Sequence, residues 1–391
     1  MQVIHINDKL EVAGGVEVYI RDALPALKLR GIGAHWVAVR RNGAEVDVAS
    51  TNALWNWRGP LSEFTQSPMA QSVGKNTIFH VNSLSEPKIL QKFFELGPVV
   101  RHMHEPRLVC PGQGKFWAKS EAACTTPFGL HCLGHAYTQR CCNRHPKRLL
   151  RQFHNTRFEV NQAADQYSAL IANSFYIKAE ALKVSYAEDR IHVVPYFTEI
   201  TPEPDWNMKQ SPVITFAGRL SRTKGVHYLL DAFSQVIRTI PYARLEILGD
   251  GQDEAMFQKQ ADVLGLSNAV KFHGWANKAT IDECLSRAAV VAFPSIYPEA
   301  FGITGIEAMM RGKPVVAFDV GGVTDWLKND ETGYSVPVKD TDAFASALTK
   351  ILSDPELANR FGRMARDNAK KFFSPSEHFS KLTKIYKSAL E

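Results

Sequence analysis

Short apolar runs alternate with amphipathic stretches along the first half of the chain. Residues from Val16 to about Leu29 repeat apolar side chains at helical spacing. Apolar runs separated by such helices are typical of a parallel sheet built from βαβ units. The runs that predict strands here are Val3–Ile6, His35–Val39, Thr77–Val81, Val99–Met103, Ala169–Ala172 and Ile191–Pro195.

A second alternating series follows a polar, proline-rich stretch, Glu199 to Pro212, which is typical of a linker. Its predicted strands are Val213–Ala217, Arg244–Leu248, Val270–His273, Val290–Pro294 and Val315–Phe318. The predicted helices between them are Val226–Ile237, Glu254–Leu264, Ile281–Ala288 and Ile306–Arg311. The same type of α/β domain is therefore expected twice.

The length of the chain agrees with two domains, because 391 residues exceed the roughly 250–300 that one hydrophobic core supports. We expect two Rossmann-like, doubly wound domains that face a cleft, at residues 1–200 and 201–374. Ligands of such sheets bind at the carboxyl ends of the strands. The tail, residues 375–391, predicts an amphipathic helix that crosses back to the first domain.

Composition supports a globular protein, with 45% hydrophobic and 22% charged residues. The formal net charge is +6, and part of it falls in one short stretch. Such a stretch is either a solvated face or the contact surface for an acidic partner: anionic lipid, a phosphate-bearing acceptor or nucleic acid. The basic residues concerned are Arg140, Arg144, Lys147, Arg148, Arg151 and Arg157.

Neither a signal peptide nor a membrane span is expected. The chain opens on a strand-like run, Val3–Ile6, without a basic leader region. No run reaches the roughly 18–20 apolar residues that cross a bilayer. We expect a cytoplasmic protein. A peripheral position on the inner face of the membrane is compatible with this expectation.

The segment from Pro298 to Met309 carries the strongest chemical pattern. A predicted strand ends in a loop that leads into a helix, and Gly302 lets the backbone approach a ligand closely. The helix N-terminus offers unpaired N–H groups suited to a diphosphate. Glu299 and Glu307 flank the loop, and carboxylates accept hydrogen bonds from vicinal sugar hydroxyls. The alternative is an acidic loop followed by an ordinary surface glutamate.

A second pattern opens the second domain, at the end of the strand Val213–Ala217. Arg219 and Lys224 place two cations in one loop, ahead of Gly225 and a helix. Two cations at the carboxyl edge of the sheet are able to neutralise a leaving diphosphate without a metal ion.

With these motifs the chain resembles the retaining GT-B glycosyltransferases of the family 4 class, the glycosyl transferases group 1. The resemblance covers residues from about Val213 to Pro337 and isolated places in the first domain. The matching segments are G-R-L-x-x-x-K-G, Leu248-Gly249-Asp250-Gly251, Phe272-His273-Gly274, the E-x7-E loop, Gly321-Gly322, Gly14-Gly15-Val16-Glu17, His104-Glu105 and Ala172-Asn173-Ser174.

The resemblance implies a role for each matching residue of the second domain. Glu307 would bind the ribose of the donor nucleotide, and Glu299 would hold hydroxyls of the donor sugar. Arg219 and Lys224 would bind the diphosphate and act in catalysis together with Glu299. Backbone N–H groups would assist them at Gly302, Ile303 and Thr304.

In the first domain the resemblance implies contacts near the reacting sugar. The loop with Gly14 and Gly15 would lie by the phosphates or the acceptor. His104 matches the histidine of the family's His-Asp pair, although Glu105 stands here in place of the aspartate. His102 is a rival for the same catalytic role.

The implied activity is that of a retaining hexosyltransferase. It would move a sugar from a nucleotide-diphosphate sugar to a glycan or lipid-linked acceptor, as in cell-envelope polysaccharide, lipopolysaccharide or glycolipid synthesis. No cofactor is required for this chemistry. The rivals are a sugar-nucleotide epimerase or other GT-B enzyme, and a non-catalytic protein whose cysteine-rich basic module binds its partner.

An insertion at about residues 106–147 concentrates five of the six cysteines. Cysteine clusters in cytosolic proteins more often bind metal than form disulfides. The alternatives are a structural zinc site, buried free thiols and disulfides, because a C-x2-C pair is absent from the spacing. The cysteines are Cys110, Cys124, Cys132, Cys141 and Cys142.

Asp340-Thr341-Asp342 has the D-x-D form of metal-binding motifs in other glycosyltransferases. It follows a predicted strand and precedes a helical run, Ala343–Leu352. An aspartate at this place is expected to cap the helix.

Overall fold

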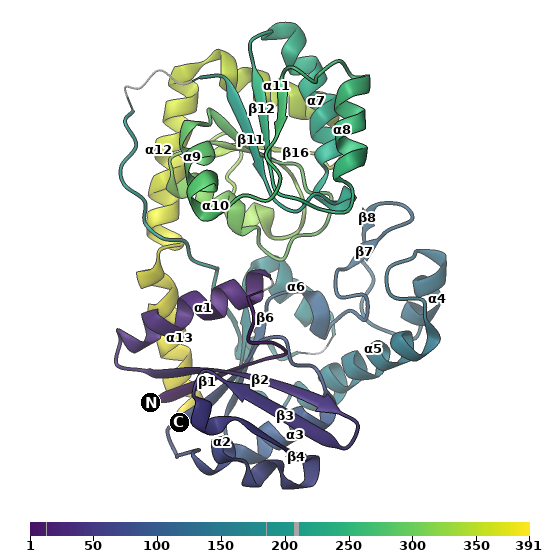
Figure 1. The fold of residues 1–391 in the computed structure, drawn as a ribbon, viewed down its shortest axis with the longest axis vertical. Coiled ribbons are helices and arrows are strands. Elements are labelled where there is room, and N and C mark those ends of the chain that lie inside the picture. Colours follow the sequence, from purple (N-terminus) through teal and green to yellow (C-terminus); the bar gives the residue numbers. More distant parts are fainter. Residues whose placement is uncertain (13, 185, 207–210) are drawn as a thin grey trace. The chain divides into compact units, whose positions relative to one another are not determined.

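The computed structural model describes residues 1–12, 14–184, 186–206 and 211–391. The chain forms two compact units (Figure 1). Unit 1 comprises Met1–Lys119, Thr125–Pro195 and His378–Glu391, and unit 2 comprises Ser120–Cys124 and Tyr196–Glu377. Residues 207–210 of the predicted linker lie outside the described residues.

The sheet of unit 1 is parallel over most of its width, in the order β10-β9-β6-β5-β1-β2-β3-β4. Strands β3 and β4 continue it antiparallel to their neighbours. The strands are β1 (Gln2–Asn7), β2 (Gly33–Asn42), β3 (Glu45–Ser50), β4 (Trp57–Pro60), β5 (Thr77–Val81), β6 (Val99–Met103), β9 (Ala169–Ala172) and β10 (Ile191–Val193). Because every residue of β5, β6 and β9 is buried, these strands form the centre of the core.

Helices connect the parallel strands of unit 1. They are α1 (Gly15–Lys28), α2 (Pro68–Gln71), α3 (Pro87–Leu96), α4 (His131–Thr138), α5 (Pro146–Phe158) and α6 (Phe175–Leu182). Helix α4 belongs to the cysteine-rich insertion, and α5 carries most of the basic stretch that follows it. The insertion also contains the short strands β7 (Phe116–Trp117) and β8 (Ala122–Ala123).

The C-terminal helix α13 (Pro375–Leu390) contributes its last turns to unit 1. The Nε2 atom of His378 lies 3.1 Å from the hydroxyl of Tyr19 on α1. The hydroxyl of Tyr386 lies 2.5 Å from Nδ1 of His80 on β5. Both side chains of α13 are buried, so the helix forms part of the unit 1 core.

Unit 2 contains a parallel sheet in the order β13-β12-β11-β14-β15-β16. Along the chain this is the 3-2-1-4-5-6 order of a Rossmann fold, in which the topological switch point lies between β11 and β14. The strands are β11 (Val213–Ala217), β12 (Arg244–Leu248), β13 (Val270–Phe272), β14 (Val290–Phe293), β15 (Val315–Phe318) and β16 (Gly333–Val336).

Helices cover both faces of the unit 2 sheet (Figure 1). Helices α7 (Val226–Thr239), α8 (Glu254–Val263) and α11 (Thr341–Ser353) lie on one side, and α9 (Lys278–Arg287), α10 (Ile303–Met310) and α12 (Pro355–Phe372) lie on the other. The carboxyl edge of the sheet carries the loops after β11 and β14. These loops contain both chemical motifs of the second domain.

The strands predicted from the apolar runs are present, but the antiparallel extension of the first sheet was not predicted. Val46 and Val48 of β3 are buried, whereas Glu45 and Asp47 are exposed. This alternation is the pattern of a strand with one covered face. The D-x-D segment caps α11 as expected, since Oδ1 of Asp340 accepts a hydrogen bond of 2.9 Å from the backbone N–H of Ala343.

Within the described part of the chain, every helix is too short or too polar to cross a bilayer.

Candidate active site

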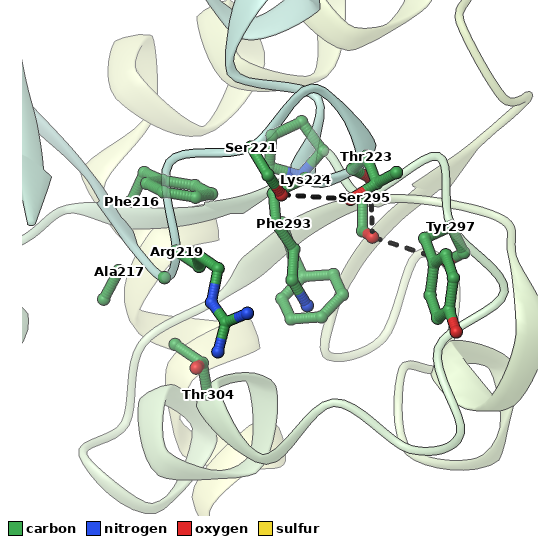
Figure 2. A pocket seen from close by; sticks show the side chains of 12 residues that line it. Phe216, Ala217, Arg219, Ser221, Thr223, Lys224, Phe293, Ser295, Tyr297 and Thr304 are labelled. Atoms are coloured by element: carbon green, nitrogen blue, oxygen red, sulfur yellow. Dashed lines mark hydrogen bonds between the residues drawn. The ribbon is translucent and has the colours of Figure 1, made fainter. Parts of the chain in front are cut away.

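A pocket of about 420 Å³ lies at the switch point of the unit 2 sheet. Its walls come from the ends of β11 and β14 and from the loops that follow them (Figure 2). The lining residues are Phe216, Ala217, Gly218, Arg219, Ser221, Thr223, Lys224, Phe293, Pro294, Ser295, Tyr297 and Thr304. Of the predicted site residues, the pocket thus brings together Arg219, Lys224 and Thr304.

Arg219 and Lys224 supply the positive charge of the pocket. Figure 2 shows the Arg219 guanidinium directed toward Thr304, at the start of α10. The loop between the two cations closes at Gly225, whose φ of 72° is left-handed. A Cβ at this position would lie 1.8 Å from the carbonyl oxygen of Pro294, so glycine lets the two loops approach each other.

Glu299 is held beside the pocket by both loops. Its Oε1 atom accepts hydrogen bonds of 2.5 Å from Lys224 and 2.7 Å from the buried hydroxyl of Ser295. Its backbone carbonyl accepts a 2.7 Å bond from the N–H of Gly322. A Cβ on Gly321 would lie 2.4 Å from that carbonyl, so the Gly321-Gly322 turn fits directly against the Glu299 backbone.

The N-terminus of α10 begins at Gly302, which has a φ of 99° and offers no side-chain acceptor. The first N–H groups of the helix are therefore available to a ligand. Trp326 fixes this terminus, because its Nε1–H donates a 2.7 Å bond to the carbonyl of Phe301. Its ring also occupies the space above Gly305, where a Cβ would meet it at 2.2 Å.

Glu307 lies one turn beyond Thr304 on α10, and side chains three positions apart share one helix face. Its side chain does not line the pocket. Burial raises the pKa of Glu307, and the nearby Arg311 opposes this shift. The guanidinium of Arg311 also donates a 2.7 Å bond to the Glu307 carbonyl.

His104 follows β6 at the carboxyl edge of the other sheet, in unit 1. Its Nε2 atom lies 2.8 Å from Oδ1 of Asn82, and its backbone carbonyl accepts from Asn173. Burial lowers the pKa of His104 well below its usual range, so the ring is neutral near pH 7. The predicted partner Glu105 is bound instead by Arg107, with Nε and Oε1 2.7 Å apart.

His102 points into the core of unit 1. It is 1% exposed, and its Nδ1 atom lies 3.2 Å from Nε2 of His80. The rings of His102 and His104 stack with centroids 3.9 Å apart. A position inside the strand surrounds His102 with protein, whereas His104 begins the loop. This geometry supports His104 over its rival, and its catalytic role stays a prediction.

The glycines of the first domain begin α1, with Gly14 as the N-cap residue and Gly15 as the first helical residue. Neither has a left-handed backbone. A Cβ on Gly15 would meet no protein atom within 4 Å. The space beside it is therefore open, and the predicted contact with phosphates or acceptor remains to be tested.

Within the described part of the chain, the cysteines of the insertion are not joined by disulfides. Among the described residues, no three of them come close enough to share one ion. Cys141 and Cys142 interact with each other, which raises the pKa of the first thiol and lowers that of the second. Cys110 and Cys132 also act on the Cys142 thiol, and a structural zinc site at these cysteines stays a prediction.

The residues of the described chain that could hold a cation together are Glu246, His273 and Cys284. They lie in unit 2, away from the cysteine-rich insertion. Arg287 already binds this group, since its Nη2 lies 2.7 Å from both oxygens of Glu246 and 3.3 Å from Sγ of Cys284. A cation would have to displace this guanidinium.

Sequence reasoning missed the polar residues that join the two loops of the pocket. Ser295 contacts the carbonyl of Thr223 as well as Glu299, and Thr223 also accepts from the N–H groups of Ile296 and Tyr297. Figure 2 shows the contacts of Ser295 with Thr223 and Tyr297 as dashed lines. Their position directly after β14, at a switch point, was the available signal.

Residues 199–368 match the model of the family described as glycosyl transferases group 1. Alpha-D-kanosaminyltransferase of Streptomyces kanamyceticus is 30% identical over 182 residues, or 46% of this chain and 47% of that protein. D-inositol 3-phosphate glycosyltransferase of Jonesia denitrificans is 32% identical over 235 residues, or 54% of this chain and 55% of that protein. The chain thus spans about half the length of these curated relatives.

Two solved structures are similar over nearly the whole chain. HepE from Anabaena, in complex with UDP, has a TM-score of 0.70 at 19% identity and covers 99% of this chain and 100% of its own. Sucrose-phosphate synthase from Thermosynechococcus elongatus has a TM-score of 0.71 at 21% identity and covers 99% and 98%. These likenesses show a shared fold.

Proposed function

We propose that this protein is a glycosyltransferase that uses a nucleotide-diphosphate sugar, because residues 199–368 match the model of the glycosyl transferases group 1 family. One observation carries the proposal: Arg219, Lys224 and the uncapped N-terminus of α10 converge on one pocket at the switch point of the unit 2 sheet. Two cations and a helix N-terminus suit a diphosphate.

In the proposed donor complex the diphosphate binds Arg219, Lys224 and the N–H groups of Gly302, Ile303 and Thr304. Glu299 lies beside these cations and accepts from the sugar hydroxyls. Glu307 accepts from the ribose on the adjoining face of α10. The pocket volume of about 420 Å³ falls in the usual range for small-molecule sites.

In the proposed reaction the bond from the anomeric carbon to the diphosphate oxygen breaks, and a bond to the acceptor oxygen forms. The acceptor hydroxyl loses its proton to the leaving diphosphate. Arg219, Lys224 and the α10 dipole stabilise the charge that develops on the leaving diphosphate. Retention of configuration and transfer of a hexose are part of the proposal. His104 and the loop at Gly14 and Gly15 are proposed to serve the acceptor side.

The proposed acceptor is a glycan or a lipid-linked glycan of cell-envelope polysaccharide or glycolipid synthesis. The basic stretch supports an acidic acceptor or an anionic membrane surface. Its residues from Lys147 to Arg157 lie on α5, and Leu150 is 58% exposed on the same helix. A cytoplasmic, membrane-peripheral location follows as part of this proposal.

A thermal-shift screen tests the donor class. UDP is tested first, because the HepE structure contains it; GDP, ADP and CMP follow, with their sugar conjugates. A ligand at about 100 times its Kd adds roughly 2.7 kcal/mol of stability, which raises the midpoint by several degrees. We expect one nucleotide to do so, and the Lys224→Met variant to lose the shift.

Incubation of the responding sugar nucleotide without and with acceptor then separates the activities. A glycosyltransferase releases nucleoside diphosphate in proportion to acceptor, whereas an epimerase converts the sugar nucleotide alone. Absence of any nucleotide shift in a folded protein would contradict the proposal.

A further inference from the structure

A second pocket lies at the opposite edge of the unit 2 sheet from the candidate active site. It has a volume of about 390 Å³ and lies between the linker, α9 and the turn from α10 to β15. That turn leads into β15, so the pocket lies at the amino ends of the strands. We call it the linker pocket; its lining residues are Thr201, Pro202, Glu203, Pro204, Asp205, Trp206, Asp282, Ser286, Arg311, Gly312 and Lys313.

Close packing builds one wall of the linker pocket. Gly312 has a left-handed φ of 67°, and a Cβ there would lie 2.5 Å from the Trp206 ring. The guanidinium of Arg363 lies over the same ring, 4.6 Å from a centroid. The indole Nε1–H donates a 3.1 Å bond to Glu203. Trp206 is therefore a fixed, flat apolar surface.

Two of the three acidic groups that line the pocket have basic partners. Glu203 lies 3.0 Å from Nε of Arg366 and 3.1 Å from Nζ of Lys370, and these contacts hold its pKa at about 2. Asp282 forms an ion pair with Arg311. Asp205 completes the acidic side chains of the lining.

Lys313 differs from these groups. It is 5% exposed, and among the described residues no acceptor or carboxylate binds its ammonium. Burial alone lowers its pKa to about 8, without any contribution from a neighbouring charge. Buried charges in proteins are normally paired, because an unpaired one loses its hydration without compensation. Lys313 is therefore a buried cation of the pocket without an anionic partner among the described residues.

We propose that the linker pocket binds a small molecule with one carboxylate, which pairs with the Lys313 ammonium while its apolar part lies against Trp206. Among the described lining residues Lys313 is the one unpaired cation, and one ammonium suits a single negative charge better than a dianionic phosphate. The acidic lining at Glu203, Asp205 and Asp282 adds to this preference, because it repels a second negative charge.

Benzoate is the probe, because it combines one carboxylate with a flat apolar ring. Its binding to the full-length protein is measured by saturation-transfer NMR and calorimetry. Lys313→Met keeps the length and apolar character of the side chain and removes the charge. We expect this variant to weaken benzoate binding roughly tenfold or more, the size of one charge-assisted hydrogen bond.

Lys224→Met is the matched control, since it removes the same group from the other pocket. Benzoate should bind this variant like the wild type, whereas UDP should bind Lys313→Met like the wild type. The two results are independent, so failure of the glycosyltransferase proposal does not decide the fate of this one. Equal loss of benzoate in both variants, or none in Lys313→Met, would overturn the proposal.

Two further measurements use the wild-type protein and therefore do not depend on whether a variant folds. Benzoate binding should weaken as the pH rises above the Lys313 pKa of about 8. The other charged groups that line the pocket are Glu203, Asp205, Asp282 and Arg311. Phenyl phosphate should bind more weakly than benzoate near pH 7.5. Tighter binding of phenyl phosphate would overturn the assignment to carboxylates, and absence of benzoate binding would overturn the site.

Discussion

Lys224 and Glu299 form a 2.5 Å ion pair between the two loops of the candidate active-site pocket, which we call the donor pocket. Lys224→Met removes one of the two cations proposed to stabilise the leaving diphosphate. We expect it to lower kcat/KM by roughly 10²–10³, the cost of removing one electrostatic contact to the transition state. Glu299→Gln should lower kcat as well, since it weakens the contacts to Lys224 and the sugar. Steady-state kinetics with the responding donor measure both.

A matched control comes from α3, where Lys92 forms an ion pair of 2.7 Å with Glu95 on the surface of unit 1. Lys92→Met removes an ion pair of the same kind that lies outside the pocket. It should leave kcat/KM unchanged. Near-wild-type activity of both Lys224→Met and Glu299→Gln would show that the site has been assigned to the wrong residues.

Lys313 should reduce the stability of the protein at neutral pH. Its folded-state pKa of about 8 lies below the usual 10.5, so between these pH values the unfolded state binds more protons and stability rises with pH. Below pH 8 the full cost remains, on the order of 3 kcal/mol at most. Lys313→Met should raise the free energy of unfolding at pH 7.

Chemical denaturation at several pH values measures this effect. The advantage of Lys313→Met over the wild type should shrink as the pH rises from about 8 to 10.5, because the wild-type amine becomes neutral in both states. A constant difference across this range would mean that packing, not charge, separates the two proteins.

Among the elements, α10 connects both pockets of unit 2 although it is only 8 residues long. Thr304, in its first turn, lines the donor pocket, and Arg311, its C-cap residue, lines the linker pocket. The Arg311 guanidinium binds the carbonyl of Glu307 between them. Packing that fixes either end of this helix therefore also positions Glu307, which we propose binds the ribose.

The position of the loop after β11 depends on the close packing of Gly225 against the loop after β14. Gly225→Ala puts a methyl group into contact with the Pro294 carbonyl and strains a left-handed residue. Gly265 has nearly the same φ, 70° against 72°, but a Cβ there meets nothing within 4 Å. Gly265→Ala should therefore cost only the backbone strain, about 1–2 kcal/mol, and Gly225→Ala about 1–3 kcal/mol more.

Thermal or urea unfolding of both variants separates the two costs. Gly225→Ala should also weaken nucleotide binding, since it moves Lys224 relative to β14, whereas Gly265→Ala should not. Equal destabilisation by both substitutions would mean that the two loops of the pocket separate without cost.

At the scale of the whole molecule, unit 1 is built around buried histidines. Burial lowers the pKa of His5 to about 3 and that of His378 to about 4, and it lowers those of His80, His102 and His104 as well. Below pH 6.5 the unfolded chain takes up protons that the folded unit does not. Wild-type stability should therefore fall as the pH drops from 6.5 toward 4.

His5→Phe tests this explanation. The His5 ring stacks on His80 with centroids 4.5 Å apart, and among the described residues neither of its nitrogens has a hydrogen-bond partner. The variant should lower the dependence of stability on pH by up to about 1.4 kcal/mol per pH unit in this range. His154→Phe, on the exposed surface of α5, should leave it unchanged. The measurement is urea unfolding at several pH values.

The sequence by itself determined the fold class and pointed to three residues of the candidate site. Apolar runs at strand length between amphipathic helices predict parallel α/β units, and the fold shared with HepE and sucrose-phosphate synthase confirms this fold class. Arg219, Lys224 and Thr304 were expected in one site and do line one pocket. The reason is local: motifs that directly follow parallel strands all emerge at the carboxyl edge of the sheet.

The tertiary structure decided what depends on contacts between distant segments. Glu299 pairs with Lys224, 75 positions away, and the Gly321-Gly322 turn fixes its backbone. The arrangement of the five cysteines also depends on tertiary contacts: Cys142 interacts with Cys141, Cys110 and Cys132, and a metal site among them stays a prediction. Lys313 lies in a turn without a distinctive sequence pattern. Only its packing beside the linker buries this side chain.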